Sequence, residues 1–347
     1  MSLLRGEEIN IGVGMENPSA RGVNVPAQKW IPGRTPTGIN VEVIKTLLKE
    51  TKASAISSQG SEIVQRKASG PIEFNLRSNL IGYLLKSLLG ECDTNPADGS
   101  PTVKDHAFTV LKGNPQFPTL TLSLAQTGMK SYEYPGALVS GLEIKFPVDD
   151  LINATAEFVA MDEEESVGEL EPTWDDEEHL LRPFEAEIKI ADSLSDLATA
   201  TAINVKDLTL SIKNGGKAQQ HIGSITPTDN IAGLISVGGK LVLDYEGETY
   251  HDIFRDGDYK AMQIKIERSD VEIGTGLHPT ITIQLAKVSL EGSSPDRPID
   301  DIAKDSFDFV AHYSEVDEEA INIVVRNEVA EYNYDVADYN YDEESGS

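Results

Sequence analysis

The sequence predicts a mainly β protein built from two tandem copies of a β-sandwich or barrel domain, each with one short helix. Three observations lead to this expectation. Many short runs alternate apolar and polar residues, few segments have helical spacing, and a set of strand and helix patterns occurs twice in the same order. Alternation with a period of two is typical of strands that bury one face.

The alternating runs predict the strands, with Gly, Pro, Asn and Asp between them as turn residues. They cover residues 72–76, 120–124, 142–146, 205–212, 240–245, 262–266, 281–285, 307–310 and 321–325.

The clearest helix follows the first of these strands. Leu80, Leu84 and Leu88 form an apolar stripe that we expect to pack on the core of the first copy. Ser78 or Asn79 is expected to cap its start, and a glycine at position 90 to end it.

A shorter helix is expected over residues 248–254, with Tyr250, Ile253 and Phe254 as its buried side in the second copy and Gly257 just beyond it. Residues 45–52 leave helix and strand open, because residues 41–43 upstream read as a strand.

Four pairs of segments support an internal duplication over chance repetition of strand patterns. They are residues 39–42 with 203–206, 70–74 with 239–243, 119–125 with 280–286, and 157–160 with 308–311. In both halves a candidate helix follows the second segment. The expected organisation is an extended arm (1–38), copy 1 (39–168), an acidic linker with the strand leading into the second copy (169–202), copy 2 (203–327) and an acidic Tyr/Asn/Asp-rich tail without stable structure (328–347).

Charge limits the possible partners. The 347 residues carry 29 Lys and Arg against 58 Asp and Glu, for a net charge of −29. A protein this acidic is a poor general binder of duplex DNA or of anionic membranes. The charge is also polarised: residues 1–90 are mildly basic and the remainder strongly acidic, which favours head-to-tail contact between copies. Cys92 is the single cysteine, so no internal disulfide is expected, and no run of apolar residues is long enough to span a membrane.

No pattern predicts an active site, a cofactor or a metal site, so we expect no enzyme. Gly12 and Gly14 lack the third glycine and the lysine of phosphate-binding loops. The six histidines have no metal-ligand spacing, and no serine lies in a nucleophile elbow.

The first ninety residues contain segments that are specific enough to indicate a protein family. Residues 6–12, the Pro- and Gly-rich segment after them, and above all residues 68–90 (ASGPIEFNLRSNLIGYLLKSLLG) resemble the major tail tube proteins of long-tailed, non-contractile (siphovirus-type) bacteriophages. In that family the last segment is a strand that runs into the subunit's one substantial helix, followed by a strand such as residues 106–110. The resemblance extends over most of residues 6–327.

The resemblance implies a structural virion protein, assembled in the cytoplasm of the bacterial host, whose rings share an inner β-barrel and stack into a tube. Its partners would be further copies of itself, other tail proteins at the tube ends, and the tape-measure protein and then DNA in the channel, without specific binding and with no membrane. An acidic channel wall would repel the phosphate backbone and let DNA slide. With two copies per chain, three chains would fill the six positions of a ring. The alternative is a virion or surface adhesin of tandem β-sandwiches that binds glycans.

Overall fold

The structure, a computed structural model, describes residues 6–34, 38–50, 58–174, 178–299 and 302–334. The mainly β expectation is confirmed: each predicted strand coincides with an observed one, and only Leu76 and Tyr245 fall one residue beyond its end. The strands fall into three groups by their pairing, and two long strands, β8 (Tyr132–Phe146) and β17 (Thr280–Asp296), each belong to two groups.

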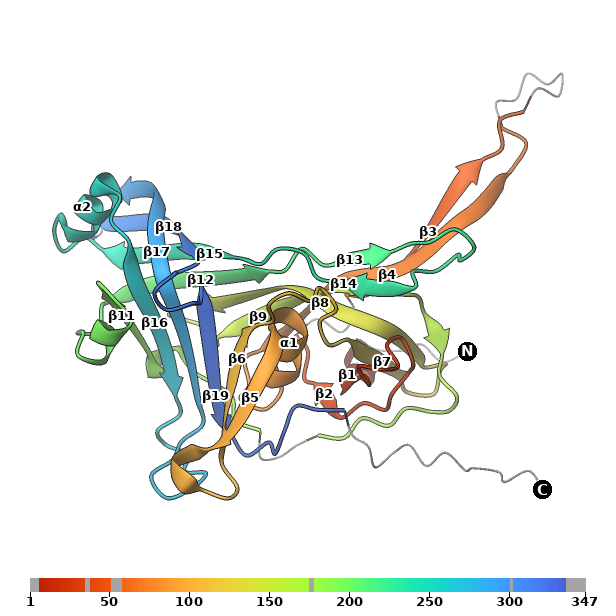
Figure 1. The fold of residues 1–347 in the computed structure, drawn as a ribbon, viewed down its shortest axis with the longest axis horizontal. Coiled ribbons are helices and arrows are strands. Elements are labelled where there is room, and N and C mark those ends of the chain that lie inside the picture. The colour runs from red at the N-terminus through yellow and green to blue at the C-terminus, as the bar shows by residue number, and fades with distance from the viewer. Residues whose placement is uncertain (1–5, 35–37, 51–57, 175–177, 300–301, 335–347) are drawn as a thin grey trace.

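The central sheet is antiparallel and contains eight strands among the described residues (Figure 1). In spatial order they are β3 (Asn40–Leu47), β4 (Ser61–Asn75), β9 (Asn153–Ala160), the second half of β8, β12 (Val205–Lys213), β15 (Ser236–Asp244), β18 (Lys304–His312) and the second half of β17.

Two smaller groups pack on this sheet. The first half of β8 pairs with β7 (Leu120–Gln126) and β10 (Glu164–Glu165), and β7 continues to β1 (Ile9–Met15) and β2 (Lys29–Ile31). The first half of β17 lies between β16 (Lys260–Glu267) and β19 (Ile321–Asn327), which continue to β11 (Ala186–Ala191) and to β6 (Lys104–Val110) with β5 (Gly90–Pro96). A separate pair joins β13 (Lys217–Gln219) and β14 (Asp229–Ile231).

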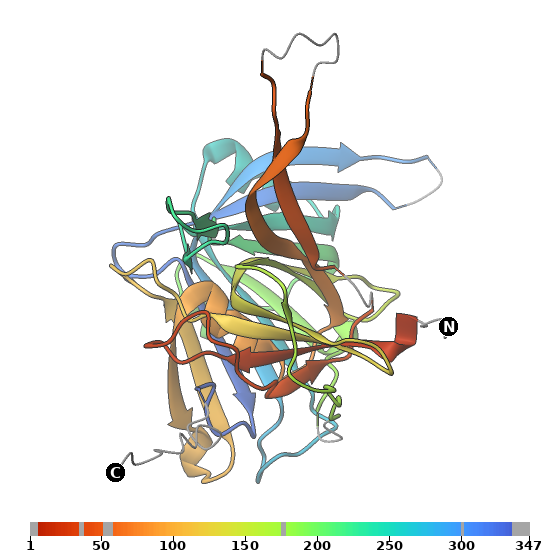
Figure 2. The same ribbon diagram turned by 90° about the vertical axis from the view of Figure 1, so that its right-hand side faces the viewer.

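Two helices accompany the sheets: α1 (Ile81–Leu89) follows β4, and α2 (Thr249–Asp256) follows β15. Helix α1 contacts β8 and the β5–β6 hairpin, whereas α2 contacts β17. One contiguous apolar core runs beneath both halves of the central sheet. Figure 2 shows the β3–β4 hairpin projecting well beyond this body. Residues 45–47, which we left open between helix and strand, belong to β3; residues 51 and 52 lie outside the described residues.

The expectation of an extended arm over residues 1–38 is wrong for the segment that forms β1. Strand β1 pairs with β7 along its whole length, and residues 11–15 are buried. Its two glycines permit a close approach: a Cβ on Gly14 would lie 2.2 Å from the carbonyl oxygen of Pro26. Gly12 and Gly14, which lack the other residues of a phosphate-binding loop, therefore serve close packing. The sequence concealed the strand because glycine replaces the alternating side chains.

Glu16, directly after β1, is a buried carboxylate that organises this region. It accepts hydrogen bonds from the hydroxyls of Thr119 (2.6 Å) and Thr121 (3.0 Å) and from the backbone N–H groups of Gly22 (2.8 Å) and Gly136 (2.7 Å). Burial nevertheless raises the pKa of the Glu16 carboxyl above its ordinary value.

Candidate assembly surface

The two faces of the central sheet differ sharply in chemistry. One face carries the apolar alternate residues of every strand, such as Phe74, Phe158 and Phe309, and packs against the helices and the smaller sheets. The opposite face is polar. Its charged side chains include the carboxylates Glu42, Glu73, Glu143, Glu157, Asp207, Asp244, Asp296 and Asp308 and the lysines Lys67, Lys145, Lys213, Lys240 and Lys304. Carboxylates outnumber lysines here, so the face has net negative charge.

The middle of the sheet is an antiparallel junction between β8 and β12. Leu208 faces Phe146, Leu210 faces Ile144 and Ile212 faces Leu142, and all six are buried. Asn214 fastens the end of this junction: its Nδ2 donates to the carbonyl oxygens of Val139 (2.8 Å) and of Leu88 (3.1 Å) in α1. Strand β12, the first strand of predicted copy 2, therefore continues the sheet of predicted copy 1.

On either side of this junction the strands have the same order. The sequence β3–β4–β9–β8 is matched by β12–β15–β18–β17. Gly70 faces Phe158 on β9, and Gly239 faces Phe309 on β18. Each unit also has a one-residue irregularity beside that phenylalanine, between Val139 and Gly141 on β8 and between Leu290 and Gly292 on β17.

Two of the four sequence pairs do not occupy corresponding places. Strand β12 puts Leu210 opposite Gly239, whereas β3 puts Val41 opposite Ala68, so residues 39–42 correspond to 210–213 and not to 203–206. Residues 120–125 pair with β1 and β8, whereas residues 280–285 pair with β16 and β19. Amphipathic strands have similar sequences, so short segments can match without occupying corresponding places in the fold.

The sheet ends in two open edges. Within the described residues, β3 pairs with β4 alone, and residues 289–296 of β17 pair with β18 alone. Unpaired strand edges expose rows of backbone donors and acceptors, which are templates for pairing with another chain.

The three leucines predicted to pack in copy 1 lie in or directly before helix α1. Leu80, Leu84 and Leu88 are each fully buried in the core. The predicted cap is wrong: the cap position is Leu80, and no side chain there caps the helix. Instead Glu178, from the predicted acidic linker, accepts the backbone N–H of Leu80 at 3.0 Å and lies 3.6 Å from Lys29 Nζ. Its side chain is only 3% exposed, so this end of the linker is part of the core packing. A capping residue 98 positions away leaves no local sequence signal.

Helix α2 is more peripheral than expected. Tyr250, Ile253 and Phe254 lie on its inner side, but all three are only half-buried. The rings of Tyr250 and Phe254 each lie 6.5 Å from the ring of Phe307. The expected terminator is present, since Gly257 has a left-handed conformation with φ of 71°.

The expectation that the C-terminal tail lacks stable structure is wrong for its first residues. Residues 328–334 are described, and Tyr332 is 1% exposed. Its hydroxyl donates to the carbonyl oxygen of Asn79 at 3.0 Å and accepts from Asn327 Nδ2 at 2.7 Å. Its ring meets His106 edge-on. The predicted absence of structure for residues 335–347 lies outside the described residues.

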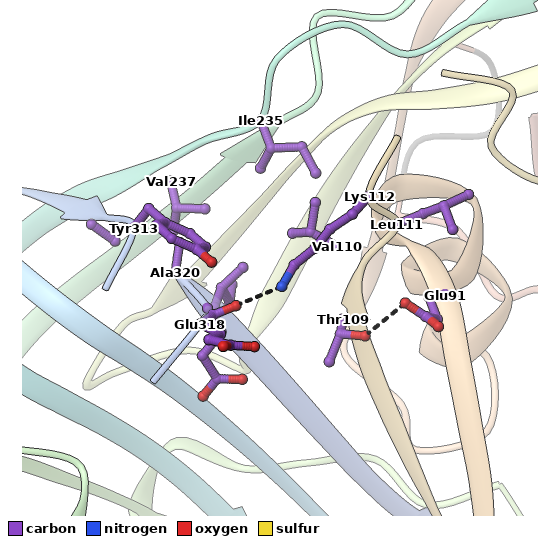
Figure 3. A pocket seen from close by; sticks show the side chains of 13 residues that line it. Glu91, Thr109, Val110, Leu111, Lys112, Ile235, Val237, Tyr313, Glu318 and Ala320 are labelled. Carbon is purple, nitrogen blue, oxygen red and sulfur yellow. Dashed lines mark hydrogen bonds between the residues drawn. The ribbon is translucent and has the colours of Figure 1, made fainter. Parts of the chain in front are cut away.

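A groove with a volume of about 820 Å³ lies between the end of β6, the start of β15 and the turn before β19 (Figure 3). Its floor is apolar, with Val110, Val237 and Ile321. At the rim, Lys112 Nζ donates to the carbonyl oxygen of Glu318 at 2.8 Å. The residues that line the groove include no histidine, cysteine or serine.

In the part of the chain that the structure describes, no cluster of three or more His, Cys, Asp or Glu side chains could hold a metal ion. No helix among the described residues has the length and apolar character needed to cross a bilayer.

Comparison with known proteins gives one family. The family model described as "Phage tail tube protein" matches residues 51–311, about three quarters of the chain; of the central sheet, β3 lies outside the match. No curated protein matches the sequence.

Proposed function

The chain belongs to the phage tail tube protein family and is a structural component of the virion; from this premise, we propose that three copies close into a ring and that the rings stack into the tail tube. The observation that carries the proposal is the central sheet, which has two matching four-strand units and an open edge at each end. The major tail tube role and the siphovirus type of tail are part of the proposal.

The number of chains follows from the two units. If each unit is one copy of a tube domain, one chain supplies two of six positions, and three chains complete the ring. The two edges differ, so β3 of one chain can meet β17 of the next in a heterologous contact, which forms a closed ring when the rotation between chains divides a full turn. Closure removes both unpaired edges.

The polar face of the central sheet is the proposed channel wall. Glu143 and Lys145 on β8 form an ion pair of 2.8 Å, but carboxylates prevail over the face as a whole. DNA carries a high density of negative charge, so a wall with net negative charge does not bind it and lets it pass. In the same proposal the tape-measure protein occupies the channel first, other tail proteins bind the tube ends, and assembly takes place in the host cytoplasm.

Electron microscopy of the purified protein tests this function. Tubes of constant diameter with an open channel are expected. Compact single subunits at all concentrations, with binding to a glycan array, would contradict it and favour the adhesin alternative, which the family match does not favour.

A further inference from the structure

We propose that residues 292–296 of one chain pair antiparallel with residues 38–42 of the neighbouring chain, in the register of the β8–β12 junction inside each chain. The inference rests on the ring proposed above and specifies its contact residue by residue. The partner is a second copy of this chain.

The template is the junction that each chain already contains. There β8 and β12 lie antiparallel, with Gly141 opposite Lys213, Leu142 opposite Ile212 and Ile144 opposite Leu210. This junction joins the last strand of the first four-strand unit to the first strand of the second. A ring of identical chains needs the same kind of joint, from the last strand of the second unit to the first strand of the next chain.

The irregular positions establish how β17 corresponds to β8. On β8, Val139 faces Phe158 and Gly141 faces Glu157, with one extra residue between them. On β17, Leu290 faces Phe309 and Gly292 faces Asp308, again with one extra residue. Because a bulge marks a unique point in a ladder, Gly292 corresponds to Gly141.

Close backbone contacts show independently how β3, at the other edge, corresponds to β12. A Cβ on Gly70 would lie 1.6 Å from the carbonyl oxygen of Gly38, and a Cβ on Gly239 would lie 1.9 Å from that of Thr209. Since Gly70 and Gly239 face the corresponding phenylalanines, Gly38 corresponds to Thr209. Residues 38–42 therefore correspond to residues 209–213 of β12.

Transferring the template gives a definite register. Gly292 faces Glu42 as Gly141 faces Lys213, so a long charged side chain again lies across from glycine. Ser294 then faces Asn40, and Asp296 faces Gly38. All of these belong to the polar face, which continues across the contact.

The apolar face agrees with this register. Val41 faces buried Ala68, so it points to the core side of the sheet, as does Ile39 one pleat away. Both are only half-buried in the single chain, whereas their counterparts Ile212 and Leu210 are fully buried at the internal junction. The neighbouring chain's β17 would complete their burial.

Engineered disulfides test the register. In a Cys92→Ser background, chains with Asn40→Cys are mixed with chains carrying Ser294→Cys, assembled and oxidised. Directly opposite residues on neighbouring strands have Cα atoms about 4.5–5.5 Å apart, within the range of a disulfide. The control replaces Ser294→Cys by Asp296→Cys, on the same face but two residues along the strand, where the separation exceeds that range.

A two-chain species is expected in the 40/294 mixture, with at most one cross-linked pair in each ring of three, whereas the 40/296 mixture should retain only monomers. Combining Asn40→Cys and Ser294→Cys in one chain should convert monomer into a covalent ring. Rings that form but cross-link equally or better in the control would overturn the register while leaving the proposed function intact. A failure to form rings by electron microscopy, before oxidation, would overturn both.

Discussion

Replacing Tyr332 with alanine should detach the C-terminal segment from α1 and lower the free energy of unfolding by about 3–5 kcal/mol, the usual cost of removing a buried aromatic ring. The ring is fully enclosed: it lies against His106 and Phe108, and Tyr83 meets it edge-on at 5.0 Å. The fit is tight, since a Cβ on Gly82 would lie only 2.0 Å from Tyr332 Cζ.

The structure separates the contribution of the hydroxyl from that of the ring. Tyr332→Phe keeps the ring but deprives the carbonyl oxygen of Asn79 of its donor, at a cost of about 1–2 kcal/mol. Tyr313→Ala is the matched control, because Tyr313 is 53% exposed and its removal should change stability by less than about 0.5 kcal/mol.

The assay is urea unfolding of unassembled subunits, followed by circular dichroism. The expected order of midpoints is wild type and Tyr313→Ala highest, then Tyr332→Phe, then Tyr332→Ala. Equal midpoints for Tyr332→Ala and Tyr313→Ala would refute the reasoning, because the segment after β19 would then contribute nothing to the fold.

Three further predictions concern the helices and the buried carboxylate. Leu84→Ala should cost about 2–5 kcal/mol by urea unfolding, and Ile253→Ala clearly less, because Leu84 is fully buried and Ile253 only half-buried; equal costs would contradict the difference between the helices. Gly257→Ala should cost about 1–2 kcal/mol for its left-handed backbone alone, and Gly90→Ala more, because its Cβ would also lie 2.7 Å from the Cβ of Leu111. Thermal unfolding of both variants measures this, and a milder effect at Gly90 would count against it. The raised pKa of Glu16 means that the folded state holds this proton more tightly than the unfolded chain, so the stabilising effect is complete below the ordinary value of 4.5 and is lost as pH rises through the folded pKa. The stability of wild type relative to Glu16→Gln should therefore decline with pH across that window, and a rising difference would show that the sign is wrong.

The sequence predicted what depends on local pattern. Alternation located the strands of the central sheet, and the leucine stripe with its following glycine located α1, because burial on one face leaves a periodic trace. The correspondence of Gly70 with Gly239 and of Phe158 with Phe309 was also visible, and the structure places each glycine opposite its phenylalanine.

The missed features depend on contacts between distant residues. Glu178 capping α1 and Tyr332 anchoring the tail lie in acidic, polar stretches that look unstructured when read locally. The open edges of β3 and β17 could not be predicted either, because an edge is a property of the whole sheet and not of its strands.

The mass of a single ring tests the central claim most directly. Rings released from tubes and measured by native mass spectrometry should have three times the mass of the 37.7 kDa chain, and tube reconstructions should show strict threefold symmetry with near-sixfold symmetry at the channel wall. Rings of six chains would contradict the account, because each chain would then supply one position and the two matching strand units would not be two copies of a tube domain.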